Sequence, residues 1–220
     1  MKAICRDWGT VDYTTAWQAM REFTDRRVDD TGDELWLLEH PAVFTLGRAG
    51  RREHILAAGD IPVIASDRGG QVTYHGPGQL VVYVLANVAR LGMGPRELVR
   101  RLEQAVIDYC AVLELRAERR PGAPGVYFEG AKLAALGLRL RRGFSYHGLA
   151  LNVDLDLEPF SRINPCGYAG MRVCRLCDLR PGLTLREVRA AFAAHVLAAL
   201  YGGGSAGAAG HGSGATRALG

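Results

Sequence analysis

Arg68-Gly69-Gly70-Gln71-Val72-Thr73-Tyr74-His75-Gly76-Pro77-Gly78-Gln79 joins two apolar, β-branched runs at residues 61–65 and 80–85, which are typical of buried strands. Four of its twelve residues are glycines, which indicates unusual backbone angles and a close approach of the main chain to a neighbouring group. A tight connection between strands would explain the glycines alone. The polar side chains between them offer more hydrogen-bonding groups than a turn requires, so the stretch predicts one wall of a substrate pocket.

This glycine-rich stretch does not match the common phosphate-binding loops. A Walker loop ends in Gly-Lys-Ser/Thr, and the chain contains no such tripeptide. A dinucleotide-binding turn opens a helix, whereas the residues that follow Gln79 are apolar and predict a strand. Neither motif therefore predicts a nucleotide site here.

Length, composition and charge narrow the class of protein. With 220 residues and 48% hydrophobic content, the chain can build one substantial core. Its net charge of +4 is too small to argue for nucleic acid. The first ten residues contain charges and no apolar core of signal-peptide length, and no apolar run approaches the roughly 20 residues that a membrane helix needs. These features predict a cytoplasmic protein, with no membrane partner, whose five cysteines are thiols.

Hydrophobic periodicity predicts the order of helices and strands. Helices are expected at residues 13–28, 95–115 and 184–201, the last opened by a capping box at Thr184 and Glu187. Further strands are expected at residues 3–8, 34–39, 43–46, 126–128, 132–140 and 146–153, with a hairpin turn at Glu129-Gly130. Few helices separate the strands, which favours a single α+β domain over residues 1–201, with a mixed, largely antiparallel sheet packed by helices. Residues 202–220, rich in glycine and alanine, predict a disordered tail.

Cys166 has the sequence context of a functional thiol. It lies between Pro165, whose φ is fixed, and Gly167, whose φ is unrestricted, so a sharp turn is expected to present the side chain. Cys110, inside the predicted helix at 95–115, is instead typical of a small buried hydrophobe. A nucleophilic thiol needs an adjacent base, and the candidates are Lys132, His75 and His147.

Lys132 stands out because only two of the 27 basic Lys and Arg residues are lysines. Strict alternation along its strand puts Lys132 on the same face as Ala134, Leu136 and Leu138, which are expected core residues. A lysine that loses part of its hydration gives up its proton more readily, and arginine does not. A shift of one residue in the register would turn Lys132 outward.

Cys174-Arg175-Leu176-Cys177 leaves a zinc or redox site as a competing interpretation. Strong zinc signatures carry a second such pair or two spaced histidines, and neither is present. A redox pair would open a helix, whereas Asp178-Leu179-Arg180-Pro181 is not typical of one. No metal site is predicted.

Five separated segments together resemble the octanoyltransferases of lipoate biosynthesis, in the biotin and lipoate protein-ligase superfamily. The resemblance spans roughly residues 34–179 and is carried by the glycine-rich stretch, Gly125-Val126-Tyr127, Lys132 to Gly137, His147-Gly148-Leu149-Ala150-Leu151-Asn152-Val153, and Ile163-Asn164-Pro165-Cys166-Gly167-Tyr168-Ala169-Gly170. It implies the α+β catalytic-domain fold of that superfamily and an acyltransferase that needs no cofactor. The Cys-x-x-Cys pair and the glycine-rich tail are not part of the resemblance.

The resemblance also implies roles for individual residues. Cys166 would be the nucleophile that carries the acyl group as a thioester, and Lys132 would be its base. The acyl pocket would be lined by Arg68, Gly69, Gly70, Gln71, Val72, Thr73, Tyr74, His75, Ala135, Leu136, Gly137, Gly148, Leu149 and Ala150.

The implied donor is octanoyl-acyl carrier protein, and the implied acceptors are lipoyl domains of 2-oxoacid dehydrogenase complexes and the glycine-cleavage H protein. Both kinds of partner are expected to be acidic, so six arginines are candidates for steering them: Arg48, Arg51, Arg52, Arg139, Arg141 and Arg142. Two alternatives remain open. One is an ATP-dependent lipoate or biotin ligase on the same fold, and the other is a non-catalytic module that binds an acyl group or zinc.

Overall fold

Two sheets form the centre of the protein. The computed structural model describes residues 3–165 and 170–202, so Cys166 and the predicted tail beyond Gly202 lie outside the described residues. The large sheet has the order β1-β2-β6-β10-β9-β8-β7, and the small sheet has the order β4-β3-β5. The strands are β1 (Ile4–Thr10), β2 (Glu34–Glu39), β3 (Val43–Leu46), β4 (Val63–Ala65), β5 (Val72–His75), β6 (Gln79–Leu85), β7 (Glu118–Arg120), β8 (Ala123–Phe128), β9 (Ala131–Arg141) and β10 (Phe144–Asn152).

Both sheets are mixed. Within the large sheet β1 runs parallel to β2, and the other neighbouring strands are antiparallel. In the small sheet β3 runs parallel to β4 and antiparallel to β5. The predicted α+β fold with a mixed, largely antiparallel sheet packed by helices is therefore confirmed.

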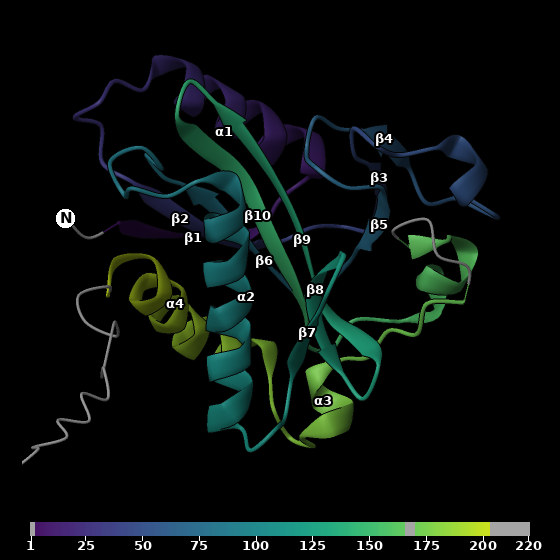
Figure 1. Ribbon diagram of the computed structural model, residues 1–220. Helices are drawn as coiled ribbons and strands as arrows, with labels where there is room; N and C mark the ends of the chain where they lie inside the picture. Colours follow the sequence, from purple (N-terminus) through teal and green to yellow (C-terminus); the bar gives the residue numbers. More distant parts are fainter. Residues whose placement is uncertain (1–2, 166–169, 203–220) are drawn as a thin grey trace, which may run out of the picture.

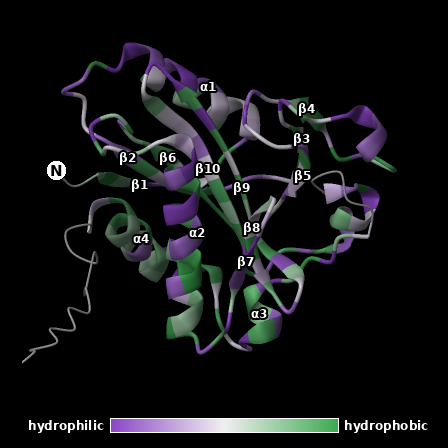
Figure 2. Ribbon diagram, viewed as in Figure 1, coloured by the Kyte–Doolittle hydropathy of each residue, from purple (hydrophilic) through white to green (hydrophobic). Residues whose placement is uncertain are grey.

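Helices cover the two faces of the large sheet. One face packs against α2 (Pro95–Val112) and α4 (Leu185–Tyr201), which also contact each other, and the opposite face packs against α1 (Tyr13–Arg26) (Figure 1). Figure 2 shows α4 as mainly hydrophobic, in keeping with its position over the core. The predicted capping box at Thr184 and Glu187 is present at the start of α4. Across the described part of the chain, no helix is long and apolar enough to cross a bilayer.

Two strands and one α-helix were not predicted from the sequence. Strand β5 lies inside the glycine-rich stretch, and β7 is a charged strand at the edge of the large sheet. A single helical turn, α3 (Leu176–Leu179), occupies the segment for which no helix was expected, so that expectation is wrong. The hairpin turn at Glu129-Gly130 is confirmed, because both residues have a positive φ, of 45° and 83°.

A β-bulge in β9 determines which way Lys132 points. The adjacent residues Val126 and Tyr127 of β8 pair with Ala134 and Lys132, so Leu133 is an extra residue in β9. Leu133 and Ala134 both lie in the core under α2, and the predicted alternation, which placed Lys132 with Ala134, is wrong. The bulge turns Lys132 to the opposite face of the sheet.

Candidate active site

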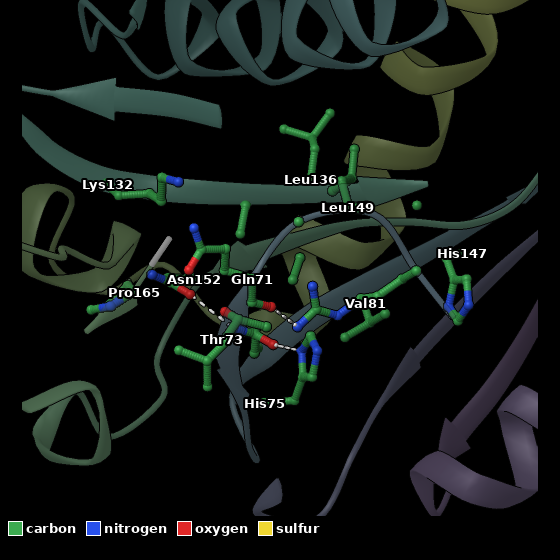
Figure 3. A pocket seen from close by; sticks show the side chains of 18 of the residues that line it. Gln71, Thr73, His75, Val81, Lys132, Leu136, His147, Leu149, Asn152 and Pro165 are labelled. Carbon is green, nitrogen blue, oxygen red and sulfur yellow. Dashed lines mark hydrogen bonds between the residues drawn. The ribbon is translucent and has the colours of Figure 1, made fainter. Parts of the chain in front are cut away.

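A pocket lies between the large sheet, the small sheet and α1 (Figure 3). Strands β9 and β10 supply small residues to it, and β5 and β6 supply polar and aromatic ones. Its lining consists of Tyr13, Arg68, Gly70, Gln71, Val72, Thr73, His75, Gln79, Val81, Tyr83, Lys132, Ala135, Leu136, Gly137, His147, Gly148, Leu149, Ala150, Asn152, Phe160, Pro165 and Val173.

Arg68 shapes the glycine-rich wall of this pocket. Its guanidinium donates to the carbonyl oxygens of Thr45, Gly69 and Gln71 at 2.6–2.9 Å, and to the Thr45 hydroxyl at 2.8 and 3.0 Å. Arginine presents five N–H donors in a fixed plane, so one side chain can hold several carbonyls of a loop at once. Arg68 therefore helps to fix the main chain of the wall.

A chain of hydrogen bonds runs from this wall across the pocket. His75 contacts the Thr45 hydroxyl through Nε2 (3.4 Å) and Gln79 Oε1 through Nδ1 (2.7 Å). Gln79 donates to Asn152 Oδ1 (3.0 Å), and Asn152 donates to the carbonyl oxygen of Cys174 (3.0 Å). Gln79 Oε1 is only an acceptor, so the proton of the neutral His75 ring is on Nδ1. Both ring nitrogens of His75 thus have hydrogen-bond partners, Thr45 and Gln79. His75 is therefore a poor candidate for the base that activates a thiol.

Lys132 is buried at the pocket, with 4% of its surface exposed. Its Nζ donates to the carbonyl oxygen of Pro124 at 3.2 Å and lies 5.3 Å from the centre of the Tyr127 ring. A Cβ atom at Gly125 would lie 3.0 Å from Lys132 Cε and 2.8 Å from the carbonyl oxygen of Ala134, so glycine leaves the room that the amine occupies. Pro165 lines the same pocket, and Cys166 follows it in the chain.

The histidines around the pocket have pKa values below that of a free imidazole. Burial lowers the pKa of His40 to about 4, and it lowers the pKa of His75 well below its ordinary value and that of His147 to a smaller extent. His40 Nδ1 donates to the carbonyl oxygen of Val11 (2.6 Å), which leaves Nε2 to accept from the Tyr83 hydroxyl (2.7 Å). The inner part of the pocket therefore carries polar groups without a positive charge on these rings.

Burial of neutral histidine predicts a loss of stability in mild acid. The pKa of His40 is about 4 in the fold against about 6.5 when unfolded, so between these pH values only the unfolded chain binds the proton. The stabilisation is present above pH 6.5 and is lost as the pH falls towards 4, by about 3 kcal/mol for His40 alone. Urea unfolding followed by tryptophan fluorescence from pH 7 to pH 4.5 should show this decline, and it should be shallower in His40→Gln. A flat profile would contradict the neutral state of these rings.

The pocket brings together most, but not all, of the residues predicted to line it. Tyr74 points away and packs between Phe44 and Phe160, with ring centres 5.6 and 5.5 Å apart, because alternation along β5 turns it into the core of the small sheet. Gly69 instead donates its N–H to the carbonyl oxygen of Leu138 on β9 (2.9 Å). These two residues are corrections to the predicted lining.

Several lining residues were missed by sequence reasoning. Gln79, Val81 and Tyr83 alternate along β6 and share one face, a period-two signal that was present in the sequence. Tyr13 comes from α1 and Phe160 from the chain after β10, and neither position carries a local signal for a pocket.

The predicted steering arginines fall into two groups. Arg48, Arg51 and Arg52 are exposed on the chain after β3, where the N–H of Arg48 bonds the carbonyl oxygen of Arg68. Arg141 pairs with Asp25 (2.9 Å) and Arg142 donates to the carbonyl oxygens of Thr24 and Asp25, while Arg139 is partly buried nearby. Only the first group adjoins the glycine-rich wall.

The Cys-x-x-Cys pair has a different environment from a reactive thiol. Burial raises the pKa of Cys174 to about 11, and burial together with the Asp154 carboxylate raises that of Cys177 to about 11. Cys174 Sγ faces the carbonyl oxygen of Ala131 (3.7 Å), whereas Cys177 Sγ faces Asp154 Oδ1 (3.0 Å). No group of three or more potential metal ligands occurs within residues 3–165 and 170–202.

Comparison with known proteins identifies the family of this fold and site. Residues 12–197 match the lipoyl protein ligase A/B catalytic domain. The chain is 60% identical over 183 residues to the octanoyltransferase of Stutzerimonas stutzeri, which covers 83% of this chain and 84% of that protein. It is 57% identical over 198 residues to the octanoyltransferase of Thiobacillus denitrificans, which covers 90% of this chain and 91% of that one.

Solved structures agree on the fold. A crystal structure of lipoate-protein ligase A bound with ATP superposes with a TM-score of 0.77 at 16% identity, over 91% of this chain and 86% of that one. On the extent of the family match and the identity to these relatives, the chain belongs to the lipoyl protein ligase A/B catalytic domain family.

Proposed function

We propose that this protein transfers an octanoyl group from octanoyl-acyl carrier protein to a lysine of a lipoyl domain, through a thioester on Cys166. The observation that carries the proposal is the burial of Lys132 beside a pocket whose lining also includes Pro165, the residue directly before Cys166. Relatives at 57–60% identity are named octanoyltransferases, which supports octanoyl as the acyl group that is transferred.

In the first half-reaction, Lys132 accepts the thiol proton of Cys166 as the sulfur attacks the carbonyl carbon of the donor thioester. The bond to the pantetheine sulfur breaks, and that thiolate takes a proton as it leaves. One thioester is exchanged for another, so little free energy is needed. The apolar part of the pocket would stabilise the bound chain by about 0.8 kcal/mol for each buried methylene.

In the second half-reaction, the amine of the acceptor lysine attacks the acyl-enzyme. The carbonyl–sulfur bond breaks, Cys166 regains a proton, and the product is an amide. A neutral amine is required, and Lys132 can accept the proton that the amine gives up. Because a thioester is converted to an amide, this step is downhill without ATP.

The proposed acceptors are the lipoyl domains of 2-oxoacid dehydrogenase complexes and the glycine-cleavage H protein. The exposed Arg48, Arg51 and Arg52 beside the glycine-rich wall support an approach by acidic partners, since opposite charge accelerates encounter.

The proposal is tested by mixing the purified protein with octanoyl-acyl carrier protein in the absence of ATP and measuring the intact mass. We expect one octanoyl adduct that disappears when a lipoyl domain is added, with octanoyl-lysine formed on that domain. If the protein instead needed free octanoate and ATP, and remained active as Cys166→Ala, the ligase mechanism would replace the one proposed.

A further inference from the structure

The pocket has two ends that differ in chemistry. Lys132 and Pro165 lie at one end, and His147 lies at the other (Figure 3). Between them Ala135 of β9 pairs with Ala150 of β10 across the sheet. These small side chains leave room along the strands. An acyl chain that starts beside Lys132 would therefore extend along β9 and β10 towards His147.

The glycine-rich wall closes the pocket at the end where His147 lies. The N–H of Gly69 bonds the carbonyl oxygen of Leu138 (2.9 Å), the residue of β9 that pairs with His147. A Cβ atom on Gly137 would come within 2.8 Å of the carbonyl oxygen of Gly69. The main chain of the wall thus lies directly on β9 here, and the space along the strands ends.

His147 is held rigidly at this closed end. Its ring is 1% exposed, its Nε2 lies 2.8 Å from Asp67 Oδ1, and its backbone adopts the left-handed region with a φ of 59°. The ring stacks on Tyr146 with centres 5.0 Å apart and makes a T-shaped contact with Tyr83, with centres 6.0 Å apart. Asp67 also accepts hydrogen bonds from the hydroxyl of Tyr146 and the indole of Trp17.

A ring held in place by a hydrogen bond limits the length of a bound acyl chain more strictly than an apolar wall that can move. An apolar pocket that adapts its shape distinguishes one methylene poorly, because each added methylene still gains about fourfold in affinity. Here a longer chain would have to displace a buried imidazole that is bonded to the partly exposed carboxylate of Asp67, which Tyr146 and Trp17 also hold. Breaking that bond would deprive the imidazole, which is 1% exposed, of its hydrogen bond to Asp67.

We propose that His147, positioned by Asp67, is the end stop that limits the length of the acyl chain, so that octanoyl fits and longer straight chains do not. This inference rests on the proposed function for the identity of the ligand. It assigns the specificity-determining role to a residue at the end of the pocket remote from Lys132.

The test replaces His147 with glycine, which removes the ring and tolerates the left-handed backbone. We expect the ratio of kcat/KM for decanoyl to that for octanoyl carrier protein to rise at least about tenfold, since two more methylenes become accommodated at about fourfold each. A ratio of two substrates cancels any general loss of activity. Binding of free octanoate and decanoate to the same proteins, measured by calorimetry, should shift in the same direction without any transfer reaction.

Two further variants give matched controls. Tyr146→Phe keeps the ring that packs on His147 but loses the hydroxyl that bonds Asp67, so the chain-length ratio should stay at the wild-type value. Ala150→Val fills the middle of the pocket and should favour hexanoyl over octanoyl, the opposite shift. His147→Asn, which also tolerates the left-handed region, replaces the glycine variant if that one does not fold.

The outcomes separate this inference from the proposed function. If the wild-type protein transfers no octanoyl group but the binding ratio shifts in His147→Gly, the proposed function fails and the end stop stands. An unchanged decanoyl-to-octanoyl ratio in folded His147→Gly or His147→Asn, in both transfer and binding, would overturn the end stop. So would an equal shift in Tyr146→Phe, because general loosening of the wall would then explain the effect.

Discussion

Replacing Cys166 with alanine is expected to abolish octanoyl transfer and to leave no acyl adduct on the protein. Removal of the nucleophile from an enzyme that works through a covalent intermediate lowers turnover on the order of 10⁶-fold. The Pro165-Cys166-Gly167 context motivates the prediction, and Pro165 lines the pocket that also holds Lys132. Intact mass and single-turnover transfer to a lipoyl domain measure the two effects separately.

The other cysteines provide the controls for this variant. Burial raises the pKa of Cys110 to about 12, and the pKa values of Cys174 and Cys177 are both raised to about 11, so these thiols stay protonated near neutral pH. Alanine variants at these three positions should keep the adduct. Peptide mapping that located the octanoyl group on any of them would refute the assignment to Cys166.

Replacing Lys132 with arginine is expected to impair transfer nearly as much as replacing it with alanine. If Lys132 only supplied a positive charge, arginine would supply it too. If Lys132 accepts and returns a proton, arginine cannot, because its pKa lies above about 12. Loss of a general base typically lowers the rate by about 10² to 10⁴. The variant also has to fit a planar guanidinium against Gly125 and Tyr127, where the lysine is closely packed.

The measurement is the rate of acyl-enzyme formation as a function of pH. In Lys132→Arg the rate should rise with pH, since hydroxide partly replaces a missing base. Lys2→Arg changes the other lysine of the chain and should have no effect, while thermal melting reports whether the buried variant folds. Near-normal turnover of folded Lys132→Arg would mean that a different group is the base.

Segments with a strong local signal were predictable from the sequence, whereas segments without one were not. Strands β2 and β3 are largely apolar runs, and α4 begins with a capping box. Strand β5 spans four residues beside glycines, and β7 is a charged edge strand, so neither has a local hydrophobic pattern. Their pairing depends on contacts with distant segments, β3 and β8.

The candidate site was predictable in its residue types but less so in its geometry. Burial of Lys132 followed from the sequence, but for the wrong reason, since β9 is apolar on both faces and hides the bulge. Tyr74 was assigned to the pocket because it lies in the glycine-rich stretch, and the unrecognised strand β5 turned it away. The contacts of His147 with Asp67 and Tyr83 join three separate parts of the chain, so no local pattern indicates them.

Because of the bulge at Leu133, the number of residues in the β8–β9 hairpin determines whether Lys132 faces the site, as well as how the two strands pair. Deleting Ala131 would let Leu133 pair with Tyr127 and Lys132 with Phe128, which restores regular pairing of β8 with β9 in a shorter hairpin. The same deletion would exchange the two faces locally, so that a leucine entered the site and an amine entered the core. Outside Gly125 and Lys132, designed or natural variants of this protein should therefore tolerate changes of residue type in this hairpin far better than changes in its number of residues.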